Sequence, residues 1–212
     1  AEAWLLDRIR GIFISGFSSD GSVSLRNAPL GCALPEVPFS IHVRNRRLTA
    51  DQFFRTLVAA NAKLPPDRQL PLVPVAAADA KRSLAGYLEG RIDLMFEEKE
   101  SGLFWLADWK TDQPGDERRG AAEDYNPAAL MTLMREEKYG WQALIYLVAL
   151  RRYLGQAFDE TPDAALNRIG GMAYVFIRGY SGKRPPDVPP SILLKPDASL
   201  VRLADTLLTG VI

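Results

Sequence analysis

Two aspartates and a lysine stand out in the stretch GYLEGRIDLMFEEKESGLFWLADWKTD, residues 86–112. Asp93 interrupts one apolar run, and Asp108 and Lys110 end a second run that follows it. Side chains alternate between the faces of a strand, so Asp108 and Lys110 project side by side, with Asp93 near them if the two runs form a hairpin. Clustered carboxylates favour a hard divalent cation between them. Lys110 would polarise a water or stabilise charge on a phosphate, which is the chemistry of a phosphodiesterase.

A plainer interpretation of the same residues stays open. An Asp-x-Lys pair on a strand is commonly an exposed salt bridge, and an Asp at a strand end commonly accepts hydrogen bonds from a turn. Short motifs of this kind also recur by chance. Spacing alone therefore favours the plain ion pair, and further evidence must decide between the two.

The elements that must position these residues alternate between helices and strands, which indicates an α/β or α+β fold. Helices are expected over 1–10, 49–64 and 197–208, with a strongly apolar helix from about 138 that Gly155 stops. Strands are expected over 36–43 and 169–180, and residues 86–112 form two strands joined by the turn EEKESG. Proline clusters mark loops at 62–74 and 184–190.

Two helix starts carry a local signal. Thr49 and Gln52 have the spacing of a capping box, in which each side chain bonds the backbone amide of the other residue. Asn126 precedes Pro127, a typical N-cap with proline in the first turn.

The composition is that of a globular domain: 212 residues, 47% hydrophobic and 25% charged, which can form one compact core. Basic and acidic residues both number 26, so any contact with DNA must be local. The single cysteine, Cys32, excludes an internal disulfide and a cysteine-rich zinc site, and fits the reducing cytoplasm. No apolar run is long enough for a membrane span. The start in a helical pattern without Met suggests a piece of a longer chain.

Four segments follow one another in an order that is specific for one protein family: GYLEGRIDLMFE, LADWKTD, YGWQALIYLVALRRYL and GGMAYVFIRG. In this order they resemble the C-terminal nuclease domain of the RecB family, the beta subunits of exodeoxyribonuclease V, within the PD-(D/E)xK superfamily. The resemblance covers residues 84–180 best, the first 80 residues loosely and the last 30 as a closing segment. It implies an α/β restriction-endonuclease-like domain over 1–212, with a central mixed sheet flanked by helices.

The resemblance also implies roles for the residues of the opening stretch. Asp93, Asp108 and Lys110 match the acid and acid-x-lysine motifs, and would be catalytic. The metal would be Mg²⁺, bound by Asp93, Asp108 and the main-chain carbonyl of Trp109. The expected reaction is in-line attack by a metal-associated water on a DNA phosphodiester, with Lys110 as the electrostatic partner.

Gln142 and Tyr146 match the Gln-x-x-x-Tyr motif of the same superfamily. They are four residues apart on a predicted helix, so they share a face and would contact a nucleotide on the substrate side. An ordinary polar border of an apolar helix explains them equally well. The flanking cations, which would touch a DNA backbone or form a solvated helix face, are Arg135, Lys138, Arg151 and Arg152.

The sequence departs from the family pattern in two places. The family usually has a histidine ligand in a helix upstream of the first aspartate, and the single histidine here, His42, stands in a strand-like segment and does not match. Asp112 stands where related sequences commonly carry Asn. Glu36 resembles an acid that precedes a strand in this family, and is a weaker candidate. Without the upstream ligand, residues 1–212 are expected to bind metal weakly and to be weakly active or inactive.

The expected function is a Mg²⁺-dependent exonuclease that degrades DNA fed by an attached helicase domain of the same chain, in double-strand break repair and recombination. The expected partners are DNA and RecC- and RecD-like subunits, in the cytoplasm and without a membrane. The alternative is a catalytically silent module of the same fold that binds DNA or a partner subunit. The intact Asp93, Asp108 and Lys110 argue against that alternative.

Overall fold

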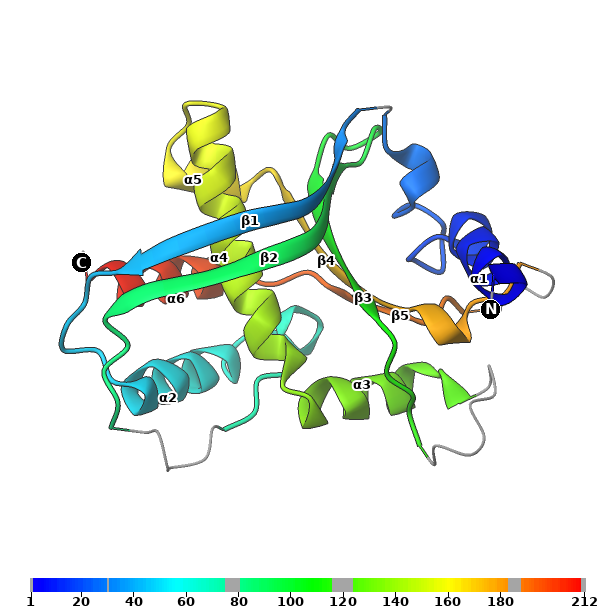
Figure 1. The fold of residues 1–212 in the computed structure, drawn as a ribbon. Coiled ribbons are helices and arrows are strands. Elements are labelled where there is room, and N and C mark those ends of the chain that lie inside the picture. The colour runs from blue at the N-terminus through cyan, green and yellow to red at the C-terminus, as the bar shows by residue number, and fades with distance from the viewer. Residues whose placement is uncertain (1, 30, 75–80, 116–123, 183–187, 211–212) are drawn as a thin grey trace. The chain divides into compact units, whose positions relative to one another are not determined.

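The computed structural model describes residues 2–29, 31–74, 81–115, 124–182 and 188–210. In this part of the chain, a mixed five-stranded sheet with flanking helices forms the α/β fold that the sequence predicts (Figure 1). The strands follow one another in the sheet in chain order: β1 (Ala33–Val43), β2 (Gly86–Glu97), β3 (Phe104–Lys110), β4 (Ile169–Phe176) and β5 (Ser191–Leu194). The expected loop at 184–190 lies partly outside the described residues.

Strands β2 and β3 form the expected antiparallel hairpin. Their register runs from Leu94 opposite Ala107 to Glu97 opposite Phe104. The buried Glu98 organises the turn, because its carboxylate accepts hydrogen bonds from the amides of Glu100 and Ser101 at 2.9 and 2.8 Å. These bonds hold the pKa of Glu98 below its usual value even though burial opposes them. The turn therefore fixes the register that places Asp93 beside Asp108.

Six helices accompany the sheet within the described residues: α1 (Glu2–Ser15), α2 (Ala50–Asn61), α3 (Pro127–Glu136), α4 (Tyr139–Ala157), α5 (Pro162–Leu166) and α6 (Ala198–Thr209). The capping box is confirmed: Thr49 Oγ1 accepts from the Gln52 amide at 3.2 Å, and Gln52 Oε1 accepts from the Thr49 amide at 3.1 Å. Asn126 caps α3 as predicted, since its side chain accepts from the Ala129 amide at 3.0 Å. No helix in the described ranges is long and apolar enough to cross a bilayer.

Several boundaries differ from the sequence prediction, including the helix expected over 49–64, which ends at Asn61, and the strand expected over 36–43, which begins at Ala33. Gly155 does not stop α4, which continues to Ala157, because this glycine keeps a right-handed conformation and the left-handed turn comes at Asp159, with φ 51°. The strand expected over 169–180 ends at Phe176, where the short 3-10 helix Ile177–Gly179 begins. Helix α1 is longer than the predicted 1–10, and β5 was not predicted at all.

The chain divides into two compact units. The first contains Ala1–Val37, Ile92–Glu136 and Gly170–Leu193, and the second contains Pro38–Arg91, Glu137–Ile169 and Leu194–Ile212. In the first unit, one face of the strands packs with α1 and the segment after it around a core of Ile12, Phe17, Val23, Leu94, Phe96, Trp105, Ala107, Ala173, Val175 and Tyr180. In the second unit, α4 packs against α5 and α6, and α2 packs against α6. Each unit thus has its own apolar contacts.

Candidate active site

Asp93 and Asp108 come together in the first unit, at the end of the β2–β3 pairing. One step beyond the pair Leu94 and Ala107, the antiparallel register places Asp93 opposite Asp108, with both side chains on the same face. The Trp109 amide then donates a hydrogen bond of 2.9 Å to Asp93 Oδ2. The first acid is therefore held by the backbone of the strand that carries the second acid.

Lys110 lies against Asp108. Its Nζ is 2.7 Å from Asp108 Oδ2, and the two side chains are 13% and 4% exposed. Burial raises the pKa of Asp108 above the usual 3.8, and the charges of Asp93 and Asp112 raise it further, while the hydrogen bond and charge of Lys110 oppose the rise. Among the described groups that act on Asp108, Lys110 supplies one positive charge beside the acids Asp93 and Asp112, which suits the site to a further cation.

Tyr174, which the sequence interpretation missed, supports the lysine. Its ring lies on the neighbouring strand β4, is fully buried, and has its centroid 5.4 Å from Lys110 Nζ. An ammonium group at this distance from an aromatic ring is attracted to it. A tyrosine inside an otherwise apolar strand was the available signal, but the sequence does not show which side chain of the next strand it meets.

The tryptophans lie on the opposite face of these strands, as the alternation predicts. Trp105 belongs to the buried core, and Trp109 packs against its edge. Gly170 makes room for this arrangement, because a Cβ at that position would lie 2.3 Å from the indole nitrogen of Trp105. The acids and the apolar core therefore occupy separate faces of the sheet.

Glu36 and His42, the weaker site candidate and the single histidine, both lie on β1 but belong to different units. Glu36 is an exposed residue of β1 with a left-handed backbone, φ 55°, a conformation that costs a non-glycine residue free energy. His42 belongs to the second unit, where its ring stacks on Tyr87 with centroids 4.8 Å apart.

Among the residues that the structure describes, no three side chains of His, Cys, Asp or Glu gather as they would around a metal ion.

Gln142 and Tyr146 lie on one face of α4 in the second unit, at the predicted helical spacing. Gln142 Nε2 is 3.0 Å from Tyr146 Oη, and this hydroxyl donates to the carbonyl oxygen of Arg91 at 2.8 Å. The Tyr146 ring also packs edge-on against Phe39, with centroids 5.5 Å apart. Arg91 precedes Asp93 by two residues along β2. The motif therefore holds the part of β2 that belongs to the second unit.

Two of the cations expected to contact DNA or solvent lie within α4 and are engaged inside the protein. Arg151 and Arg152 both pair with the buried carboxylate of Asp205 on α6, and Arg151 is itself buried. Burial lowers the pKa of both arginines. These two side chains hold α4 to α6, so they do not form the solvated face or the DNA contact considered from the sequence.

The donor set at Asp93 and Asp108 fits a hard divalent cation. It offers two carboxylates and the carbonyl of Trp109, all oxygen donors, and the described contacts use one oxygen of each carboxylate. Mg²⁺ commonly binds through one or two carboxylates and keeps several waters. The residues present can therefore hold such an ion, with water supplying the remaining positions.

Comparisons with known proteins identify the family of the chain. The sequence model of the PD-(D/E)XK nuclease superfamily matches residues 32–205. The chain is 38% identical over 100 residues to the RecBCD enzyme subunit RecB of Haemophilus influenzae, which is 47% of this chain and 8% of that protein. It is 35% identical over 106 residues to RecB of Mycolicibacterium smegmatis (50% and 9%), and 29% identical over 125 residues to RecB of Escherichia coli (59% and 10%). The chain thus spans a tenth or less of each of these three relatives.

Proposed function

The chain belongs to the PD-(D/E)XK nuclease superfamily, and from this premise we propose that it hydrolyses phosphodiester bonds of DNA with Mg²⁺ at Asp93, Asp108 and the Trp109 carbonyl. The observation that carries the proposal is the bond from the Trp109 amide to Asp93, which ties the first acid, on β2, to the backbone of β3 beside the second acid, Asp108. The Lys110 ammonium, 2.7 Å from Asp108, supplies the third element of the motif.

In the proposed hydrolysis each residue of the site has a separate role. Asp93 and Asp108 hold the cation, which when bound supplies positive charge and Lewis acidity at the phosphate. Lys110 stabilises the negative charge that develops on the phosphate oxygens. Tyr174 positions Lys110 through its ring. Gln142 and Tyr146 act on the substrate side and fix β2 through the Arg91 carbonyl.

We further propose that this nuclease acts as an exonuclease within a larger helicase-nuclease in double-strand break repair and recombination. The relatives named above are subunits of the RecBCD enzyme, and the chain corresponds to a small part of each. The partners would then be a helicase domain of the same polypeptide and RecC- and RecD-like subunits, in the cytoplasm.

One observation favours a second candidate, a silent module that binds DNA without cutting it. Asp108 is already paired with Lys110, and no third acid or histidine joins the two aspartates in the described part of the chain. Such a site binds a cation more weakly than one with another charged ligand. The two candidates differ in whether the phosphodiester bond is broken.

The deciding experiment compares the wild type with Asp108→Ala and Lys110→Ala on linear single- and double-stranded DNA over a range of Mg²⁺ concentrations. Each substitution should lower the cleavage rate by about a hundredfold or more, the scale seen when one electrostatic group of an active site is removed. Lys99→Ala and Glu100→Ala, exposed residues of the β2–β3 turn, are the matched controls and should cleave normally. Because residues 1–212 alone are expected to be weakly active or inactive, the comparison uses the full-length parent chain; a full-length wild type that binds DNA without cutting it at any Mg²⁺ concentration would establish the silent module instead.

A further inference from the structure

A tight turn at the end of β1 presents two arginines to solvent. The turn spans Asn45 to Leu48 and is closed by a bond of 3.2 Å from the Leu48 amide to the Asn45 carbonyl oxygen. The Asn45 side chain also accepts from the Arg47 amide at 3.2 Å. Arg46 and Arg47 occupy the two central positions and are exposed. Their backbone is therefore ordered by the turn itself.

The same turn is anchored to helix α6. The amide of Arg44 donates to the Leu208 carbonyl oxygen at 3.0 Å, and the Asn45 side chain donates to that of Leu207 at 3.2 Å. All of these residues belong to the second unit. The arginines consequently stand on a fixed part of the fold.

Arg82 joins this group from the segment before β2. Its carbonyl oxygen accepts from the Ala50 amide at 2.9 Å, and Ser83 forms an antiparallel bridge with Thr49. Arg44 and Arg82 are exposed, like Arg46 and Arg47. Within the described residues, none of these four arginines forms an ion pair with a carboxylate. Four positive charges are thus gathered in a chain whose net charge is zero.

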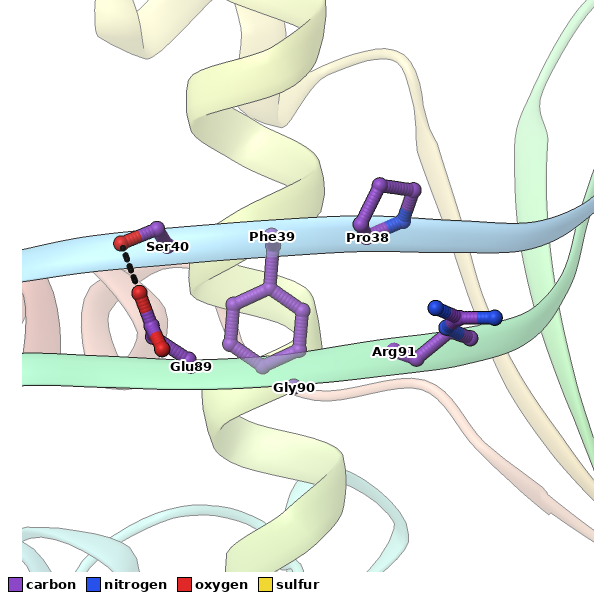
Figure 2. Close-up of a pocket in the computed structure, with 6 residues that line it drawn as sticks. All are labelled: Pro38, Phe39, Ser40, Glu89, Gly90 and Arg91. Atoms are coloured by element: carbon purple, nitrogen blue, oxygen red, sulfur yellow. Dashed lines mark hydrogen bonds between the residues drawn. The ribbon is translucent and has the colours of Figure 1, made fainter.

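An exposed aromatic stack lies on β1 and β2, near the segments that carry the arginines. The rings of His42 and Tyr87 are nearly parallel, at 13°, and Tyr87 is 71% exposed. Two residues away on each strand, Ser40 donates a bond of 3.3 Å to Glu89 (Figure 2). Because side chains two residues apart on a strand share a face, the His42–Tyr87 pair lies on the same face of the ribbon as this bond. A hollow of about 720 Å³ continues along this ribbon, lined by Pro38, Phe39, Ser40, Glu89, Gly90 and Arg91 (Figure 2).

We propose that Arg44, Arg46, Arg47 and Arg82, together with the Tyr87–His42 stack, form a binding site for single-stranded DNA, here named the arginine–tyrosine patch. The arginines would contact successive phosphates, and an unpaired base would stack on the open face of Tyr87. The site lies in the second unit, whereas Asp93, Asp108 and Lys110 lie in the first. It rests on the proposed function only in that DNA is the substrate.

The chemistry favours a single strand over other polyanions. A tyrosine ring that stays mostly exposed while its other face is covered by an imidazole offers a free π-face, and bases stack on such faces without sequence preference. Bases inside a duplex are already stacked on one another, so duplex DNA would use only the arginines. An acidic protein would not need the aromatic ring. The Tyr87 ring therefore favours single-stranded DNA over duplex DNA and over an acidic protein.

The test measures binding of fluorescein-labelled dT15 to the 212-residue chain by anisotropy in EDTA, which prevents metal-dependent cleavage. Four phosphate contacts predict a slope of about −2.8 for the logarithm of the binding constant against that of salt concentration, at about 0.7 per contact for a single strand. In the double variant Arg46→Ala with Arg47→Ala the slope should become shallower by about 1.4, and binding should weaken at least about fivefold. Circular dichroism and thermal unfolding confirm that each variant folds.

The matched control is the double variant Lys63→Ala with Arg68→Ala, exposed cations beyond the far end of α2, about 18 Å along that helix. It should keep the affinity and the slope of the wild type. Tyr87→Ala should weaken binding of dT15 about five- to a hundredfold with an unchanged slope, and Tyr87→Phe should restore it. Because the assay contains EDTA, binding is measured apart from cleavage, so a failure of the proposed hydrolysis would leave this result intact.

Three outcomes would overturn the proposal. Equal losses in the Arg46/Arg47 double variant and the Lys63/Arg68 control would show that the charges act without a defined site. Binding of a 15-base-pair duplex as tight as that of dT15, and insensitive to Tyr87→Ala, would remove the single-strand assignment. Displacement of dT15 by decaglutamate at a similar concentration would point to an acidic protein partner.

Discussion

The backbone amide of Trp109 donates a hydrogen bond of 2.9 Å to the carboxylate of Asp93. This bond connects strand β3, which carries Asp108 and Lys110, to the aspartate of strand β2. It uses one carboxylate oxygen of Asp93. Asp93 therefore has two roles: it accepts the hydrogen bond that fixes the site, and it offers negative charge to a cation. Substitutions can separate these two roles.

Asp93→Asn is expected to fold as stably as the wild type but to lose most cleavage activity. The amide oxygen of Asn still accepts from the Trp109 amide, while the charge needed for a cation is gone. Asp93→Ala should lose the hydrogen bond as well and lower the free energy of unfolding by about 1.5–3 kcal/mol, the range for bonds to charged groups. Chemical denaturation and a cleavage assay on the same samples measure both effects. Equal stability of the Asn and Ala variants would show that the bond contributes nothing to folding.

Lys110→Met is expected to make stability depend on pH. Burial already raises the pKa of Asp108 above 3.8, and the substitution removes the ammonium group that opposes this rise. A carboxyl whose pKa is higher in the folded state stabilises the fold below its unfolded pKa and loses that contribution as pH rises through the folded pKa. The variant should lose about 3–5 kcal/mol at pH 8 and less at pH 5, because breaking a buried pair leaves an uncompensated charge.

The double variant Asp108→Asn with Lys110→Met isolates the cause of this dependence. It keeps the shape of the pair but has no titrating group, so its unfolding free energy should vary less with pH than that of Lys110→Met. Urea denaturation between pH 5 and pH 8 compares the three proteins. A single Lys110→Met variant with the pH profile of the wild type would contradict the assignment to Asp108.

Tyr174→Leu is expected to lower the cleavage rate at saturating DNA with little change in the Michaelis constant. The ring lies 5.4 Å from Lys110 Nζ, so its removal takes away one contact that positions the ammonium group, while the pair with Asp108 remains. A cation–π contact with a desolvated lysine is worth about 1–2 kcal/mol, which corresponds to a rate loss of about five- to thirtyfold. Tyr174→Phe keeps the ring and should restore the rate. If Phe and Leu are equally slow, the ring does not position the lysine.

Tyr146→Phe and Gln142→Ala are expected to weaken cleavage with little effect on metal affinity. The Tyr146 hydroxyl donates to the Arg91 carbonyl oxygen, so Tyr146→Phe leaves that oxygen without this donor and should cost about 0.5–1.5 kcal/mol of stability. Gln142→Ala removes the bond to the hydroxyl but keeps the one to Arg91, and should cost less. Calorimetric titration with Mn²⁺ beside the cleavage assay separates substrate from metal effects. A collapse of metal affinity in either variant would assign both residues to the metal site.

Local sequence signals predicted the local parts of the structure. The Thr49–Gln52 capping box and the Asn126 cap are confirmed because each depends only on neighbours along the chain. The hairpin of residues 86–112 is confirmed because the alternation of apolar and polar residues fixes which face each side chain takes. Gly155 misled the prediction, since a glycine ends a helix only where the backbone turns left-handed, and that turn comes at Asp159.

Contacts between distant segments could not be predicted in the same way. Tyr174 meets Lys110 because β4 lies next to β3, a pairing that neither segment specifies alone. Arg82 joins Arg46 and Arg47 only because Ser83 bridges Thr49, over a separation of 34 residues in sequence. Asp205, the partner of Arg151 and Arg152, lies on the closing helix and likewise gives no sign of this role in the sequence.

Divalent cations are expected to raise the unfolding temperature of the chain. A cation near Asp108 offsets the unfavourable burial of its charge, and a ligand that binds only the folded state stabilises it by about 1.4 kcal/mol at ten times its Kd. Because no third acid, histidine or cysteine joins Asp93 and Asp108 among the described residues, the affinity should be weak and the rise should need millimolar Mg²⁺. Asp108→Asn should abolish the rise, whereas Glu100→Gln, an exposed acid of the β2–β3 turn, should keep it. Thermal unfolding in EDTA, Mg²⁺ and Ca²⁺ measures the effect, and an equal rise in Asp108→Asn would place the stabilising ion away from this site.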